Sequence, residues 1–169
     1  MKEAVIVSGA RTPVGKFGGA FKDVGAPDLG AAAIKAALTR AGISPDLVEE
    51  VVIGNAVQAA EAGYAARLAS LKSGIPEKVP TIAVNRQCSS GLEAINMAAQ
   101  LIKTGEAEIV VAGGTENMSQ VPFLIDYKAR FDGLRLGNST LLDGLTEGLG
   151  CPVNRYHMGV TAENVAERF

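Results

Sequence analysis

Cys88 is the side chain whose type and position most directly suggest chemistry in this sequence. It lies between an apolar run at residues 81–85 and a helical pattern over residues 88–103. A thiol at such a strand-to-helix junction faces the unpaired backbone N–H groups and the positive dipole end of the helix, which favour thiolate over thiol. Because thiolate is the nucleophilic form, the junction predicts covalent acyl chemistry at Cys88.

The residues that follow the thiol strengthen this interpretation. Ser89, Ser90 and Gly91 are small and leave room for a substrate carbonyl beside backbone N–H groups, as an oxyanion hole requires. The alternative is that Cys88 is a small core residue, because free cysteine is among the most buried residue types. The position of Cys88 alone leaves both interpretations open.

Other side chains that could do chemistry carry weaker signals. His157, the only histidine, lies in a polar loop, where a hydrogen-bonded structural role is common. Cys151 lies in a glycine-rich loop and is interpreted as structural or incidental. Glu116 and Asn117 could line a site, although buried polar residues that pin a turn are more frequent.

Phosphate, dinucleotide and metal sites are not indicated. Residues 9–16 resemble a phosphate-binding loop, but their spacing is one residue too long and Phe17 occupies the place of the required Ser or Thr. A Gly-x-Gly-x-x-Gly fingerprint does not follow the first apolar run. One His and two Cys at distant positions do not form a recognisable metal cluster. We therefore expect no metal and no prosthetic cofactor.

The composition indicates an α/β domain rich in tight turns. The chain has 169 residues, of which 47% are hydrophobic, with 20 Gly and no Trp. A net charge of −2 gives no hint of a nucleic-acid surface, and no apolar run approaches the ~20 residues that span a bilayer. Residues 1–3 lead directly into an apolar run, so no signal peptide is expected, and two Cys favour a reducing compartment. We expect a cytoplasmic protein without nucleic-acid or membrane partners.

Apolar runs that alternate with helical patterns must position Cys88. The predicted elements are strands at residues 4–8, 51–53, 81–85 and 108–112 and helices at residues 29–41, 64–72 and 88–103. Asp28 is a good cap for the first helix and Gly42 a good stop. This alternation predicts a mostly parallel sheet with helices on both faces.

Two further patterns concern the third helix and the end of the chain. Apolar side chains at spacings of four, three, four and three predict one buried helix face. These residues are Cys88, Leu92, Ile95, Ala99 and Ile102. Residues 120–158 hold many Gly, Asp, Asn and Pro and indicate an excursion from the sheet, and a last helix is predicted to begin near Val160 or Thr161.

Four segments together resemble the thiolases, the family of acetyl-CoA acetyltransferases and 3-ketoacyl-CoA thiolases. Residues 85–92 (Asn-Arg-Gln-Cys-Ser-Ser-Gly-Leu) resemble the nucleophile motif of that family, and residues 8–19 resemble its N-terminal signature. Residues 113–119 resemble the segment that leads from the fourth strand into the loop domain, and residues 157–164 resemble the substrate-pocket loop. The four segments occur in the order of the family and cover nearly the whole chain.

The resemblance implies a reaction and three site residues. Cys88 would take an acyl group from an acyl-CoA as a thioester, with its own backbone N–H as one oxyanion donor. A second acyl-CoA, deprotonated at its α-carbon, would then attack that thioester in a Claisen condensation, and the reverse reaction is thiolysis of a 3-ketoacyl-CoA. His157 and Met158 would line the pocket near the thioester end of the pantetheine arm, without acting as the general base. CoA is then a substrate rather than a cofactor.

The resemblance also implies an incomplete thiolase-like α/β fold. Residues 1–118 would form the N-terminal core that carries the nucleophile, and residues 119–169 the beginning of an inserted loop domain. The family keeps a Gly-His-Pro motif, a second catalytic Cys in a Cys-x-Gly motif and an Asn-Glu-Ala motif in a second half, and none of these motifs occurs in this sequence. We therefore expect the chain to be inactive alone and to need a complementary C-terminal half or second subunit, in a homo- or hetero-oligomer.

Alternatives remain for both origin and function. The chain is either one subunit of a split enzyme or a truncated product of a longer one. A ketoacyl-synthase-like condensing enzyme would share the fold and a Cys at the same junction, but its nucleophile motif differs from residues 87–91. A non-catalytic acyl-CoA-binding or scaffold subunit would keep the pocket residues while Cys88 stays inert.

Overall fold

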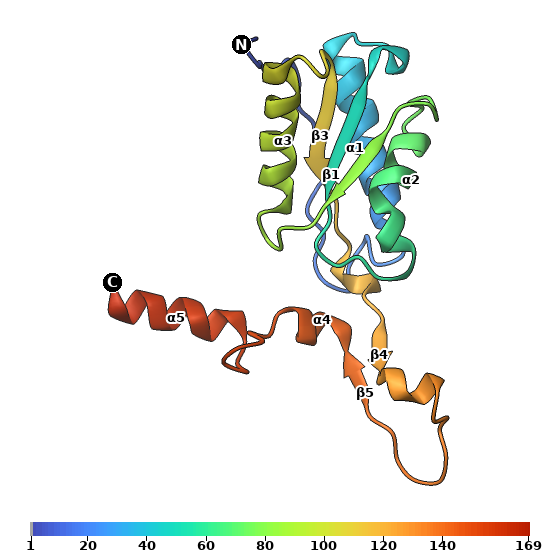
Figure 1. Cartoon of the computed structure of the whole chain (residues 1–169), viewed down its shortest axis with the longest axis vertical. Helices are drawn as coiled ribbons and strands as arrows, with labels where there is room; N and C mark the ends of the chain where they lie inside the picture. The colour runs from blue at the N-terminus through green and yellow to red at the C-terminus, as the bar shows by residue number, and fades with distance from the viewer. Residues whose placement is uncertain (1) are drawn as a thin grey trace. The chain divides into compact units, whose positions relative to one another are not determined.

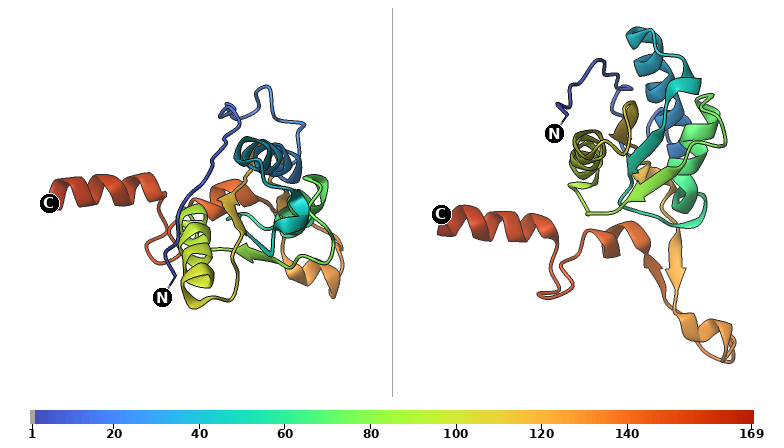
Figure 2. Two further views of the ribbon diagram at one scale, coloured as in Figure 1. Left: turned by 90° about the horizontal axis from the view of Figure 1, so that it is seen from above. Right: turned by 45° about the horizontal axis from the view of Figure 1, so that its top comes forward.

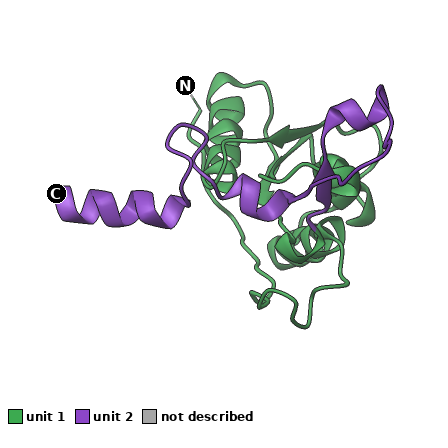
Figure 3. Cartoon of the chain, turned by 90° about the horizontal axis from the view of Figure 1, so that it is seen from below, with its two compact units in different colours: residues 1–120 green, residues 121–169 purple. Residues whose placement is uncertain are grey.

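The computed structural model describes residues 2–169 and divides the chain into two compact units, each described here by itself (Figure 3). The first, which we call the core unit, ends at Gln120. The second, which we call the hairpin unit, is Val121–Phe169. Cys88 therefore belongs to the core unit, and His157 and Met158 belong to the hairpin unit.

A three-stranded parallel sheet forms the centre of the core unit. Its strands are β1 (Glu50–Gly54), β2 (Thr81–Val84) and β3 (Val110–Gly114), in the order β2-β1-β3. Val51 of the central strand pairs with Thr81 on one side and Val111 on the other. Because both faces of β1 are covered, its apolar run is continuous rather than alternating.

Helices cover both faces of this sheet, as predicted (Figure 1 and Figure 2). Helices α1 (Ala26–Ala41) and α2 (Ala65–Lys72) pack on one face, and α3 (Ser90–Thr104) packs on the other. Buried apolar side chains join the sheet to α1 and α2 in one cluster. These are Ile34, Leu38, Val48, Val51, Ile53, Ala66, Ala69, Ile75 and Val79. The strands predicted at residues 51–53 and 81–85 are confirmed, whereas β3 begins and ends two positions later than predicted.

The first helix begins earlier than predicted and has a different cap. Gly25 is its N-cap residue and a proline lies in its first turn, which suits a helix start because proline lacks the N–H that would stay unpaired there. Asp28 lies inside the first turn and accepts a hydrogen bond from Lys72 Nζ at 2.7 Å, so the prediction that it caps the helix is wrong. Gly42 ends the helix with φ of 65°, as predicted.

The strand predicted at residues 4–8 does not form. A strand needs a neighbour that pairs with its backbone N–H and C=O groups, and nothing within residues 2–169 pairs with this segment. Its apolar side chains Val5, Ile6 and Val7 are consequently exposed. The segment is held near its two ends, where Lys2 forms an ion pair with Glu108 at 2.7 Å and Arg40 Nη1 donates to the carbonyl of Gly9 at 2.8 Å.

The buried face predicted for the third helix is also wrong. Its buried side chains are the small ones of Ser90, Ala94 and Ala98, whereas Leu92 is 63% exposed and Ile95 is 42% exposed. Close packing against β1 is the physical reason. A Cβ added to Gly54 would lie 2.4 Å from the carbonyl carbon of Ser90, so bulky side chains do not fit between this helix and the sheet.

The hairpin unit contains a short antiparallel pair and two helices. Strand β4 (Phe123–Ile125) pairs with β5 (Leu141–Asp143), and α4 (Gly144–Gly148) follows directly. Helix α5 (Met158–Arg168) begins before the predicted start, and all of its side chains are exposed or half-buried. Short 3₁₀ helices lie in the connections of both units: η1 (Pro45–Leu47), η2 (Ala60–Tyr64), η3 (Met118–Gln120) and η4 (Tyr127–Arg130). Throughout residues 2–169, helices fall short of the length and apolarity needed to cross a membrane.

Candidate active site

Cys88 lies in a tight connection between β2 and α3, which we call the nucleophile turn (residues 85–90). The strand ends at Val84 and the helix begins at Ser90, so the predicted strand-to-helix junction is present. The thiol is free and exposed. This exposure excludes the interpretation of Cys88 as a buried core residue and leaves its sulfur open to reagents just before the first turn of a 15-residue helix.

The backbone of the nucleophile turn is strained at Gln87. Its φ is 51°, which is the left-handed region that residues with a Cβ disfavour. Ser90 stabilises this bend from inside the fold, since it is only 4% exposed. Its hydroxyl donates to the carbonyl of Gln87 at 2.6 Å and accepts from the N–H of Arg86 at 2.9 Å. The strain and these bonds together fix where the backbone of Cys88 lies.

Asn85 holds the same turn from its other side. Its Nδ2 donates to the carbonyl of Ala56 at 2.9 Å, and its Oδ1 accepts from the N–H of Gln87 at 3.1 Å. Sequence reasoning missed this residue as a site component. A signal was available, because asparagine near a turn commonly bonds to the backbone two residues on.

Glu116 pins the loop that follows β1 with both of its carboxylate oxygens. Its Oε1 accepts from Asn55 Nδ2 at 2.8 Å, and its Oε2 accepts from the N–H groups of Ala56 at 2.7 Å and Val57 at 3.3 Å. Asn55 also donates to the carbonyl of Thr115 at 3.0 Å. Of the two interpretations that the sequence left open, the structure favours the turn-pinning one.

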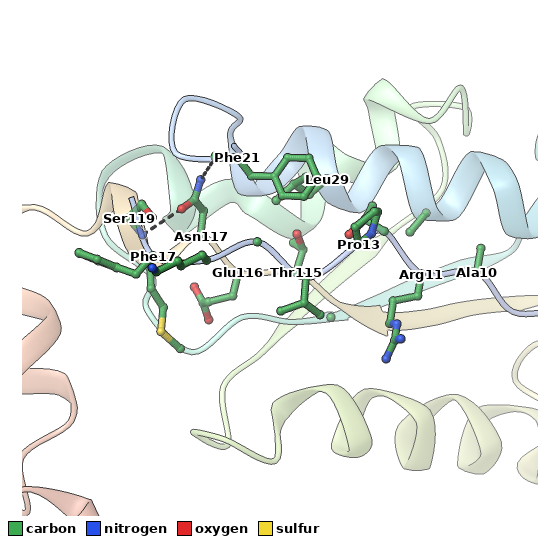
Figure 4. A pocket seen from close by; sticks show the side chains of 17 residues that line it. Ala10, Arg11, Pro13, Phe17, Phe21, Leu29, Thr115, Glu116, Asn117 and Ser119 are labelled. Carbon is green, nitrogen blue, oxygen red and sulfur yellow. Dashed lines mark hydrogen bonds between the residues drawn. The ribbon is translucent and has the colours of Figure 1, made fainter. Parts of the chain in front are cut away.

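Asn117 has a comparable structural role. Its Nδ2 donates to the carbonyls of Phe21 at 2.9 Å and Val24 at 2.7 Å, and its Oδ1 accepts from the N–H of Ser119 at 2.9 Å. Figure 4 shows this side chain between Phe21 and Ser119. Asn117 therefore ties the loop before α1 to the segment after β3.

A cavity of about 460 Å³ lies at the carboxyl end of β3 (Figure 4). Its walls come from residues 10–17, Phe21, Leu29, Ala33 and residues 114–119. Cys88 lies at the carboxyl end of β2, in a different part of the sheet edge. The cavity and the candidate nucleophile are therefore separate features of the core unit.

His157 and Met158 mark the start of α5 in the hairpin unit. His157 is the N-cap residue, and its Nδ1 accepts from the N–H of Gly159 at 3.0 Å. An accepting Nδ1 places the proton of a neutral imidazole on Nε2. Met158 is the first helical residue and is 47% exposed.

The second thiol, Cys151, lies in a turn whose backbone favours its charged form. The N–H of Asn154 approaches its Sγ at 3.4 Å. This N–H, followed by that of Val153, lowers the pKa of Cys151 below the usual value for cysteine. Sequence reasoning treated Cys151 as incidental and had no signal for this contact, which depends on how the turn closes.

Metal-binding side chains do not gather anywhere in the part of the chain that the structure describes. In residues 2–169, no three His, Cys, Asp or Glu side chains are placed together so that they could hold a metal ion.

Comparison with known proteins gives concordant results. The family model described as "Thiolase, N-terminal domain" matches residues 4–169. The acetyl-CoA acetyltransferase of Cupriavidus necator is 49% identical over 170 residues, which include 100% of this chain and 43% of that protein. A probable acetyl-CoA acyltransferase of Staphylococcus aureus is 48% identical, with the same shares covered.

A solved structure shows the same architecture. The crystal structure of the Bacillus anthracis acetyl-CoA acetyltransferase matches with a TM-score of 0.92 and 39% sequence identity, over 99% of this chain and 42% of that chain. The chain thus spans less than half the length of the relatives that it matches.

Proposed function

The chain belongs to the thiolase family, whose N-terminal domain model matches residues 4–169, and from this membership we propose that it supplies the nucleophile of an acyl-CoA acetyltransferase. In the first step, Cys88 loses its proton to a base and its sulfur attacks the thioester carbonyl of an acyl-CoA. The bond from that carbonyl to the CoA sulfur breaks, and CoA leaves as a thiol after taking a proton. Cys88 is then a thioester, and CoA esters are substrates rather than resident cofactors.

The second step forms the carbon–carbon bond. A second acyl-CoA loses an α-proton to a base of the complementary half or subunit, and the resulting carbanion attacks the thioester on Cys88. The bond between sulfur and carbonyl carbon breaks, which releases a 3-ketoacyl-CoA and restores Cys88. The same steps in reverse, with CoA as the attacking thiol, are thiolysis.

The observation that carries this proposal is the exposed thiol on a strained, hydrogen-bonded turn at the start of α3. A thiol in this position is accessible to a substrate and lies near the positive end of a helix dipole. The first turn of α3 is also uncrowded, because a Cβ added to Gly91 would meet nothing within 4 Å outside the backbone of the helix itself. The backbone N–H of Cys88 is proposed as one oxyanion donor.

His157 and Met158 are proposed to line the substrate pocket near the thioester end of the pantetheine arm. His157 keeps its Nδ1 on the N–H of Gly159, which leaves Nε2 as a donor for a substrate carbonyl or amide. The exposed thioether of Met158 offers a flexible apolar contact. Neither residue is proposed as the base that activates Cys88.

A complementary half or subunit is proposed to supply that base and to cover apolar surface of the core unit. His157 is the only histidine of the sequence, and its Nδ1 is already engaged in a cap. The exposed side chains of Val5, Ile6, Val7, Leu92 and Ile95 are apolar surface of the core unit that such a partner would cover. We accordingly propose a homo- or hetero-oligomer as the working form. Two free thiols support a reducing compartment such as the cytoplasm.

Thiolysis of acetoacetyl-CoA tests the proposal. The chain is assayed alone and together with the part of the Cupriavidus necator relative that lies beyond the matched region. That relative, divided at the same point and reassembled, is the positive control. We expect turnover only in the mixtures and its loss with Cys88→Ala. Turnover by the chain alone at an ordinary rate would contradict the need for a complement. An inactive mixture beside an active control would contradict the catalytic role and favour a non-catalytic subunit.

A further inference from the structure

The carboxyl ends of all three strands of the core unit are joined by one chain of hydrogen bonds that ends at the nucleophile turn. After β3, Glu116 accepts from the N–H of Ala56, which follows β1. The carbonyl of the same Ala56 accepts from Asn85, which follows β2. Asn85 in turn accepts from the N–H of Gln87, the residue directly before Cys88.

The chain passes through the backbone at Ala56 and through the side-chain amide of Asn85. Ala56 receives a charged acceptor on its N–H at 2.7 Å and offers its carbonyl to an amide at 2.9 Å. Asn85 uses its donor toward β1 and its acceptor toward the turn. The carbonyl of Ala56 shares its peptide group with the N–H of Val57, which donates to Oε2 of Glu116 at 3.3 Å, so Glu116 polarises the group that accepts from Asn85.

The last link acts on the one residue of the turn that is strained. Gln87 is left-handed, a conformation that a residue with a Cβ keeps only when surrounding bonds hold it there. Its N–H is bound by Asn85 at 3.1 Å, and its carbonyl is bound by the hydroxyl of Ser90 at 2.6 Å. If Asn85 releases that N–H, Gln87 relaxes and Cys88 moves relative to the start of α3.

We propose that Asn85 is the positioning residue of the nucleophile, and that Glu116 supports it through Ala56. Asn85 does not touch substrate in this account, and it acts through the backbone of Gln87. The inference rests on the proposed role of Cys88 in acyl transfer. The placement of the Cys88 thiol by Asn85 can nevertheless be tested without that reaction.

Alkylation of the complete 169-residue chain with iodoacetamide tests the proposal, because it reads thiol placement without any acyl-CoA. The chain holds two cysteines, so Cys151 in the hairpin unit serves as an internal reference in each sample. Peptide mass mapping gives both rates. We expect Asn85→Ala to slow modification of Cys88 by about three- to fivefold, the size of a helix-terminus effect, and to leave Cys151 unchanged.

Relief of the strain provides a rescue. Glycine adopts a positive φ freely, so Asn85→Ala combined with Gln87→Gly should return the Cys88 rate to within about twofold of Gln87→Gly alone. Asn117→Ala is the matched control, because Asn117, like Asn85, donates to backbone carbonyls and accepts from a backbone N–H in the same unit, but does not touch the turn. We expect this control to leave the Cys88 rate at its wild-type value.

Three results would overturn the inference: an unchanged Cys88 rate in Asn85→Ala, an equal loss in Asn117→Ala, or failure of the glycine rescue. If circular dichroism shows that Asn85→Ala unfolds, Asn85→Asp replaces it. This variant keeps the acceptor for the N–H of Gln87 and loses the donor to Ala56, so a smaller slowing is expected, and an unchanged rate would contradict the proposal. If alkylation follows the proposal but the mixture with the complementary part is inactive beside an active control, only the proposed function is refuted.

Discussion

Asn55 and Glu116 form a partly buried contact between the ends of two strands. Nδ2 of Asn55 donates to Oε1 of Glu116 at 2.8 Å, and Asn55 is only 2% exposed. The same carboxylate binds the N–H groups of Ala56 and Val57, so one side chain after β3 fixes the backbone after β1. The geometry of the sheet edge that carries Cys88 depends on this contact.

Glu116→Ala is expected to destabilise the protein by about 1–3 kcal/mol, because it removes the acceptor of the N–H of Ala56 and one of the two acceptors of Asn55 Nδ2. Urea unfolding followed by circular dichroism measures the loss. Glu93→Ala is the control, since its ion pair with the exposed Arg86 is worth at most about 1 kcal/mol. An equal loss of unfolding free energy in the two variants would show that the Glu116 contacts stabilise the protein no more than a surface ion pair does.

Gly54→Ala is expected to separate α3 from the sheet. The new Cβ would meet the carbonyl carbon of Ser90 at 2.4 Å, and overpacking of this kind costs about 1–3 kcal/mol. The control is Gly113→Ala in the neighbouring strand, where a Cβ meets nothing within 4 Å. Unfolding free energies from urea titration should drop for the first variant and stay near wild type for the second. A similar drop in both would contradict the close packing of α3 on β1.

Glu50 makes the unfolding free energy depend on pH in a defined direction. Desolvation raises the pKa of its carboxyl above the ordinary value, and its Oε1 lacks a hydrogen-bond partner within residues 2–169. The folded state disfavours the charged form of Glu50. Its contribution to the free energy of unfolding is therefore fully present at a pH below its pKa in the unfolded chain. That contribution is lost as the pH rises through its higher pKa in the folded protein.

Glu50→Gln should therefore stabilise the protein at neutral pH and bring little change in acid. The measurement is the difference in unfolding free energy between variant and wild type across this pH range, which cancels the titration of other carboxyls. A difference that stays constant with pH, or that favours wild type at neutral pH, would contradict the burial of this charge.

Cys151 is expected to react with iodoacetamide at lower pH than an ordinary cysteine. The N–H groups of Asn154 and Val153 lower its pKa, so its thiolate forms earlier as pH rises. The rate of Cys151 modification against pH, read by peptide mass mapping, gives the midpoint. The same chain in concentrated urea is the control, in which the midpoint should return to the usual range. Coincident midpoints in the two conditions would show that the turn has no such effect.

Local sequence patterns predicted those parts of the fold that depend on neighbours along the chain. The apolar runs at residues 51–53 and 81–85 form strands, because their own side chains favour burial in a sheet. Gly42 ends α1, because glycine itself permits the positive φ that is needed there. The junction around Cys88 followed from the same reasoning. The matched family and the parallel sheet with helices on both faces agree with these predictions.

The errors have a different origin, because they concern contacts between distant segments. Residues 4–8 have a strand-like composition, but a strand also needs a pairing partner. The apolar row that contains Leu92 and Ile95 shows the right period, yet close approach to Gly54 selects the small side chains of α3 for the buried face. The bridge from Asn85 to Ala56 spans separate strands, so no local pattern reveals it.

Acetylation of Cys88 is the most direct test of the central claim. The chain, assembled with the complementary part of the Cupriavidus necator relative, is incubated with acetyl-CoA, quenched in acid and digested for peptide mass mapping. The account predicts one acetyl group on the peptide that contains Cys88, no label on Cys151, and removal of the label when CoA is added. Absence of that label in a complex that catalyses thiolysis, or its persistence in Cys88→Ala, would contradict the assignment of Cys88 as the nucleophile.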